Sequence, residues 1–138
     1  MTTLTEHAPS WRPPDRHEWQ LAGVVWDVVQ APDHLADRAL PRLNDDAVGA
    51  VWRDHYKRRM YWMVPSGTAG RWTPLPYIEV HGRGARVEIP PAGLVRGLGP
   101  HWVREPEPGR LLTDPEALHE SLSMAHRLSY DPWAEERR

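Results

Sequence analysis

The 138-residue sequence contains no cysteine and no phenylalanine, and its 17 basic residues include a single lysine, Lys57. Without cysteine there is no disulfide scaffold, no thiolate metal site and no cysteine nucleophile. No apolar run reaches the ~18 residues of a membrane-spanning helix, and no basic segment precedes an apolar core near the N-terminus. We therefore expect a soluble, cytoplasmic protein with no membrane partner.

The length predicts about one domain with a modest core. Residues 1–17 are polar and contain three prolines, so they are predicted to form a flexible lead-in that Trp11 pins to the body. Residues 18–128 are predicted to form a single domain, and residues 129–138 a charged tail with Trp133 as an anchor. In the absence of phenylalanine, most of the eight tryptophans are expected to be packing residues.

Charge is distributed unevenly along the chain. Residues 53–87 carry seven basic and two acidic side chains, for a local charge of +5, whereas residues 105–138 carry four basic and eight acidic ones, for −4. The net charge of −2 argues against a protein that coats nucleic acid over its whole surface. A binding surface for phosphate is therefore expected only in the middle of the chain.

The pattern of apolar residues predicts an α+β fold, with one antiparallel or mixed sheet of about five strands and two helices packed on one face. Strands are predicted within 18–29, over 47–54 and 59–65 as an antiparallel hairpin, within 77–91, and over 101–104. In the first of these, Val24, Trp26 and Val28 share one face of an extended strand. Asp27 is expected to point to the opposite, polar face.

Two helices are predicted from their start signals. Asp33 is a suitable N-cap for the first helix, which Pro41 limits or kinks. Asp114 is the expected N-cap of the second, and Pro115 suits its first turn. The second helix carries an apolar stripe made of Leu118, Leu122 and Ala125.

Residues 77–91, YIEVHGRGARVEIPP, are predicted to form a hairpin whose two-residue loop is Arg83 and Gly84. In that register Glu79 lies opposite Glu88, with His81 on the same polar face, and the two like charges require a compensating cation. One reading is an ordinary solvated sheet face. The other is a small metal-dependent enzyme that uses Glu79, Glu88 and His81, with or without Asp54, to hold Mg²⁺ or Mn²⁺.

The turn between the strands at 47–54 and 59–65 combines basic and aromatic residues. The candidate phosphate ligands are Arg58 and Arg59 in this turn, together with Arg83 and Arg86 in the later hairpin. The candidate stacking residues are Tyr56 and Tyr61. The alternative is an exposed turn made soluble by its charge. No catalytic residue and no metal ligand is assigned, and no cofactor is predicted.

Four segments resemble the later half of the bifunctional primase-polymerase domain of bacteria, phages and plasmids. They are RRMYWMVPSGTAGRW, YIEVHGRGARVEIPPAGL, GPHWVREP and LLTDPEALHESL, between Arg58 and about Leu122. The chain is similar also to small actinobacterial proteins that carry this likeness. In the family an acidic residue in a "D-V-R-G-x-G" context supplies the third acid of the metal site. Glu79 stands at that position, and Trp102 fits the family's later aromatic strand.

The resemblance also shows which family residues are missing. The first acidic pair, of the type "V-x-D-x-D", has no counterpart, because the two candidate strands contain only Asp27 and only Asp54. Arg59 or Met60 replaces the histidine of the second motif. Two-metal nucleotidyl transfer needs carboxylates that position both ions, so primer synthesis is not expected.

The resemblance and the central positive charge together imply a non-catalytic, degenerate module. It would bind a nucleotide or nucleic-acid phosphate, such as that of a single strand, or act as a regulatory protein. The alternative is a protein-interaction module without a ligand, which docks a partner through exposed tryptophans such as Trp11, Trp72 or Trp133. The sequence leaves enzymatic activity undecided, with the balance against it.

Overall fold

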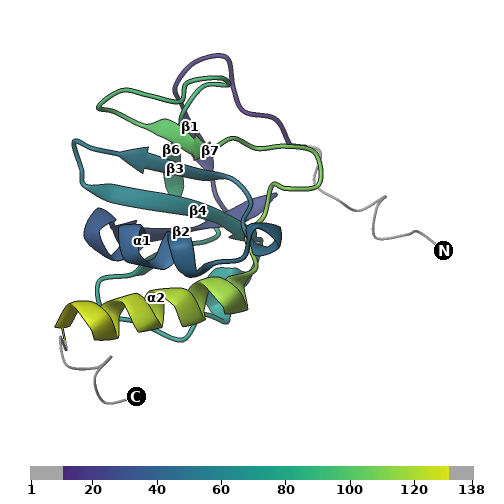
Figure 1. Ribbon diagram of the computed structural model, residues 1–138. Coiled ribbons are helices and arrows are strands. Elements are labelled where there is room, and N and C mark those ends of the chain that lie inside the picture. The colour runs from purple at the N-terminus through teal and green to yellow at the C-terminus, as the bar shows by residue number, and fades with distance from the viewer. Residues whose placement is uncertain (1–10, 131–138) are drawn as a thin grey trace.

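Two helices and seven strands lie between residues 11 and 130, the part of the chain that the computed structural model describes (Figure 1). In chain order they are β1 Glu18–Leu21, β2 Trp26–Pro32, α1 Asp33–Ala39, β3 Val51–Asp54, β4 Arg59–Pro65, β5 Glu79–His81, β6 Arg86–Ile89, β7 His101–Arg104 and α2 Pro115–Tyr130. Short 3₁₀ turns occur at Leu40–Arg42, Asp45–Ala47 and Thr68–Gly70.

Five strands form the central sheet in the order β5-β2-β4-β3-β7, and every neighbouring pair is antiparallel. The predicted α+β class, the sheet of about five strands and the β3–β4 hairpin are confirmed. The remaining strands, β1 and β6, pair with each other as a separate antiparallel ribbon, which the sequence did not predict.

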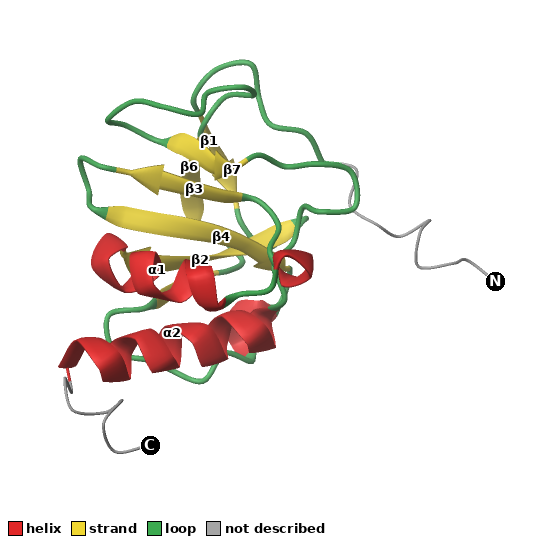
Figure 2. Ribbon diagram, in the orientation of Figure 1, coloured by secondary structure: helices red, strands yellow, loops and turns green. Residues whose placement is uncertain are grey.

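Both helices pack on one face of the five-stranded sheet, as predicted, and Figure 2 shows them together below it. The apolar stripe of α2, including Leu118 and Leu122, meets Val29 of β2 and Trp62 of β4 in one buried cluster. The helix α2 begins at Pro115 as expected. In α1, Asp33 is the first helical residue rather than the cap.

The β1–β6 ribbon covers the opposite face of the sheet and completes a second buried cluster. Val87 and Ile89 of the ribbon pack there with Trp52, Met63 and Trp102 of the sheet. Four tryptophans are almost fully buried, which confirms their predicted packing role: Trp26, Trp52, Trp62 and Trp102. The molecule thus has three layers, with helices on one side of the sheet and a ribbon on the other (Figure 1).

The predicted hairpin of residues 77–91 is wrong. β5 pairs with β2 in the large sheet, whereas β6 pairs with β1 in the ribbon. Val80 accordingly packs against the helix-side cluster, while Val87 lies in the ribbon-side cluster. The tight turn itself exists, since the amide of Ala85 donates to the carbonyl of Gly82 at 3.0 Å, but it joins two sheets instead of two paired strands.

A second turn, residues 22–25, crosses the same corner beside it. The amide of Ala22 donates to the carbonyl of Ala85 at 2.8 Å, and Gly23 packs directly on the backbone of Arg83. The antiparallel pair β2–β5 therefore bends at this corner and continues as β1–β6. Strands that change sheets in this way form the corners of orthogonally packed sheets.

Two predicted positions in the first strand also need correction. Val24 lies in the turn before β2 and is 78% exposed, so it does not share the buried face of Trp26 and Val28. Asp27 is only 1% exposed instead of facing solvent. The predicted strand 47–54 is shorter than expected, because Asp45–Ala47 forms a 3₁₀ turn and β3 starts at Val51.

Parts of both predicted end segments belong to the folded body. α2 continues to Tyr130, so the helix includes the first two residues assigned to the charged tail. Trp11 pins residues 11–17 to the body, as predicted, because its indole donates to Gln20 at 3.0 Å and meets the ring of Trp26 at 5.9 Å. Residues 1–10 and the predicted anchor Trp133 lie outside the described residues.

Candidate functional site

A small cleft of about 90 Å³ lies where the β1–β6 ribbon meets the sheet around β2, β3 and β4. Five residues singled out in the sequence contribute to its walls: Asp54, Tyr61, His81, Arg86 and Glu88. Further lining side chains come from Trp19, Gln30, Trp52 and Lys57. The cleft is therefore the place where the predicted polar face and the predicted basic turn come together.

Stacked aromatic rings form the floor. Trp52 lies opposite Tyr61 in the β3–β4 pairing, and their ring centroids are 5.1 Å apart with the planes tilted by 12°. Burial, and after it the negative charge of Asp54, raise the pKa of Tyr61 to about 12, although Arg59 opposes the rise. The phenol is thus neutral near neutral pH. Because Tyr61 is 9% exposed and already stacked, its ring is not open to a base as predicted.

One wall is a chain of hydrogen bonds across β2 and β5. The side-chain amide nitrogen of Gln30 donates to Glu79 at 3.1 Å, and the amide oxygen lies 2.7 Å from Nε2 of His81. An amide oxygen only accepts, so Nε2 of His81 must carry the hydrogen. The three side chains are fixed in one orientation by their mutual bonds.

Asp54 places a buried carboxylate in the cleft. It is 4% exposed, and its Oδ1 accepts the backbone amide of Lys57 at 3.2 Å, which closes the turn between β3 and β4. The turn is tight enough for Arg58 to adopt a φ of 56°. Within residues 11–130 no basic side chain forms an ion pair with Asp54. Its negative charge is available to a ligand.

The rim carries an exposed indole and a cation. Trp19 is 54% exposed, and the ammonium of Lys57 lies 5.5 Å from its ring centroid. Glu88 lies opposite Trp19 in the β1–β6 ribbon, with a carboxylate oxygen 3.7 Å from Nδ1 of His17. A planar group that enters the mouth of the cleft would meet an aromatic face beside positive charge.

The four candidate phosphate ligands do not form one cluster. Arg58 and Arg59 lie at the β3–β4 turn, and Arg86 lines the cleft. Arg59 lies opposite Pro32, the last residue of β2. Arg83 instead packs on Gly23, in the turn that precedes the first residue of β2. The length of that strand separates Arg83 from Arg58 and Arg59, and Arg83 does not line the cleft, so we leave it out of the candidate site.

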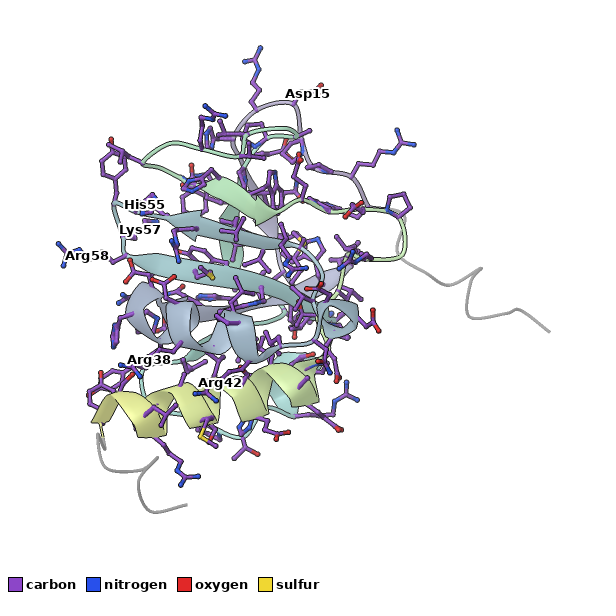
Figure 3. All side chains as sticks on the ribbon, viewed as in Figure 1. Asp15, Arg38, Arg42, His55, Lys57 and Arg58 are labelled. Atoms are coloured by element: carbon purple, nitrogen blue, oxygen red, sulfur yellow. The ribbon has the colours of Figure 1, made fainter. Side chains whose placement is uncertain are left out.

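The β3–β4 turn exposes the remaining basic and aromatic groups. Tyr56 is 76% exposed, and its amide donates to the carbonyl of Leu98 at 3.1 Å. Figure 3 shows His55, Lys57 and Arg58 projecting from this turn on the same side of the molecule. Tyr56 is therefore accessible for stacking, which stays a prediction.

Glu79 and Glu88 do not face each other, because they belong to different sheets. The compensating cation that the predicted register required is not needed. No three histidine, aspartate or glutamate side chains among residues 11–130 are arranged to hold a metal ion, and Glu79, His81 and Glu88 do not form such a group.

A larger hollow of about 570 Å³ lies between residues 68–73 and the start of α2. Arg71 and His119 line it, and Nε2 of His119 lies 2.9 Å from the carbonyl oxygen of Thr73. None of the residues predicted for phosphate binding contributes to this hollow. It provides control positions away from the cleft.

Comparisons of the chain with protein-family models, with curated proteins and with solved structures give no match. The resemblance to the primase-polymerase domain stays a prediction based on the motifs. Among residues 11–130, neither helix has the length and the apolar composition that a membrane span requires.

The raised pKa of Tyr61 predicts a loss of stability at high pH. In the unfolded chain tyrosine ionises near pH 10, whereas in the fold Tyr61 does so at about 12. The unfolded state thus releases this proton first as pH rises. The stabilising contribution is complete below about pH 10 and disappears between about pH 10 and 12.

Urea unfolding at a series of pH values would test this expectation, with Tyr61→Phe as the comparison. The wild-type free energy of unfolding should fall more steeply over this interval than that of the variant, which has no phenol to ionise. Parallel curves for the two proteins would contradict the assignment.

Proposed function

We propose that this chain is a non-catalytic, primase-polymerase-like module that binds nucleotides or single-stranded nucleic acid at the cleft. A base would stack on the exposed indole of Trp19. The adjacent phosphate would be bound by Lys57 and the arginines of the rim. The observation that carries the proposal is the exposed indole with a cation 5.5 Å from its centroid at the mouth of a polar cleft.

The charges around the cleft suit a weak, salt-sensitive interaction. Four basic side chains lie at or near it, namely Lys57, Arg58, Arg59 and Arg86. Asp54, Glu79 and Glu88 offset part of this charge. Two or three phosphate contacts to a single strand would give a slope of log affinity against log salt of about −1.4 to −2.1.

Fluorescence anisotropy with a labelled, mixed-sequence oligonucleotide of about 12 nucleotides at low salt tests the proposal. Trp19→Ala should weaken binding about tenfold or more, because stacking contributes roughly 1–3 kcal/mol per base. Arg58→Ala/Arg59→Ala should weaken binding and make the salt slope shallower by about 1.4.

Arg71→Ala is the matched control, since this exposed arginine lines the other hollow. It should leave both affinity and salt slope unchanged. No binding at low salt, or equal binding by the wild type, Trp19→Ala and the double arginine variant, would overturn the proposal.

A protein-binding role is the second candidate, and exposed apolar side chains of β1 favour it. Trp19 and Leu21 lie two residues apart, so they share one face of the strand, and they are 54% and 55% exposed. The predicted docking tryptophans Trp11 and Trp72 are instead partly buried against the core. Leu21→Ser discriminates the two functions, because it should impair protein capture and leave oligonucleotide affinity unchanged.

A further inference from the structure

The volume of the cleft limits what enters it. At about 90 Å³ it is well below the ~300–1,000 Å³ of pockets that enclose a small molecule. A base stacked on Trp19 would therefore insert one edge and leave its sugar and phosphate at the rim. The hydrogen-bonding groups inside the cleft would then meet that edge only.

Lys57 and Arg86 also line the cleft and only donate, but the proposed function assigns both of them to the phosphate at the rim. The other polar groups that remain free to meet the base are mainly acceptors. Asp54 and Glu88 contribute carboxylates, and an ionised carboxylate has no hydrogen to donate. The amide nitrogen of Gln30 is already engaged by Glu79, and Nε2 of His81 is engaged by the amide oxygen of Gln30. The neutral phenol of Tyr61 remains able to donate one hydrogen.

A base that carries hydrogen-bond donors on its edge can pair with these carboxylates. The exocyclic amino group of cytosine, adenine or guanine presents two N–H donors, and carboxylates accept readily from the amino group of cytosine. Uracil and thymine carry an oxygen at the corresponding place. That oxygen would face a carboxylate with no hydrogen between them, so this pair would lose its hydrogen bonds to water without replacement, and only the ring N–H beside the oxygen could still donate.

We propose that the cleft selects amino-bearing bases over uracil and thymine, with Asp54 and Glu88 as the specificity-determining residues. The inference rests on the proposed function, because it concerns the base that stacks on Trp19. The selectivity comes from hydrogen bonds to the edge of the base, whereas the stacking and the phosphate contacts are the same for all bases.

Oligomers of deoxycytidine and deoxyuridine, each of about 12 nucleotides, provide the matched ligands. The two bases have the same ring size and differ in the amino or oxo group and the hydrogen at the ring nitrogen beside it. Anisotropy titrations at about pH 8 should show the cytidine oligomer binding about tenfold tighter.

Asp54→Asn tests the source of the preference. The asparagine side-chain oxygen can still accept the backbone amide of Lys57, and the asparagine NH₂ group can donate to an oxo group on the base. The ratio of the two affinities should fall to about threefold or less, with Glu88→Gln acting in the same direction. Asp46→Asn, at an exposed position away from the cleft, should leave the ratio unchanged.

The outcomes separate the inference from the function on which it rests. If neither oligomer binds, the proposed function fails. If both bind equally to the wild type and both still depend on Trp19, the function stands and the base preference is wrong. A preference that survives in both Asp54→Asn and Glu88→Gln would also overturn the assignment. Thermal unfolding of each variant verifies that it folds.

Discussion

Replacing Gly23 by alanine is expected to lower the free energy of unfolding by roughly 3 kcal/mol, from two additive causes. Gly23 has a φ of +95°, a backbone conformation that costs an L-residue about 1–2 kcal/mol. An added Cβ would also lie 2.4 Å from the Cα of Arg83 and 2.8 Å from its amide nitrogen. Backbone atoms cannot rotate away, so the two turns of the corner would have to separate.

Gly84→Ala separates the two causes. Gly84 lies in the facing turn with a nearly equal φ of +90°, but a Cβ added there would have no atom within 4 Å. We expect this variant to lose only about 1–2 kcal/mol from the backbone strain. Urea unfolding of the wild type and both variants measures the difference. Equal losses for the two alanine variants would show that the corner is not closely packed in solution.

The same corner explains where prediction of the fold from sequence succeeded and failed. The strand Arg59–Pro65 and the start of α2 were predicted with their observed bounds, because local patterns determine them. The alternation in residues 77–91 was also real. In a three-layer fold, however, both faces of the sheet are buried, so Val80 and Val87 are both apolar and yet lie in different clusters. Alternation alone does not show which face each side chain buries.

The candidate site was predictable to a similar extent. The polar face and the basic turn were identified from the sequence, and Arg86, His81 and Glu88 do line one cleft. Trp19 was not identified, because an exposed tryptophan in a strand has the same local pattern as a buried one. Asp54 was considered only as a metal ligand. Its place in the cleft depends on the packing of the ribbon over the sheet, which no local pattern specifies.

The second large effect on stability is expected from Asp27→Ala, which should lower the free energy of unfolding by roughly 3 kcal/mol. Oδ2 of this 1% exposed aspartate accepts the amides of Gly67 at 3.1 Å and Ala69 at 2.9 Å. Hydrogen bonds to a charged group contribute about 1.5–3 kcal/mol each, and neighbouring bonds are not fully additive. Oδ1 has no partner among the described residues, so its removal offsets part of the loss.

Asp27→Asn should cost less, about 1 kcal/mol, because one oxygen remains to accept the same amides without the full charge. Asp46→Ala, at an exposed position, should change stability by less than about 0.5 kcal/mol. Hydrogen exchange provides a local readout, since the amides of Gly67 and Ala69 should lose protection in the alanine variant. Unchanged protection at both amides would contradict the role assigned to Asp27.

This role gives a physical reason for a buried acid within an apolar strand. Trp26 and Val28 face the ribbon, whereas Asp27 faces the helix side, near the start of β2. The turn of residues 66–70 lies against it and brings two backbone amides that need acceptors. An apolar residue there would leave both amides unpaired. The sequence pattern placed Asp27 on a solvent-exposed face of the strand. The turn that buries Asp27 comes from about 40 residues further along the chain, so no local pattern reveals it.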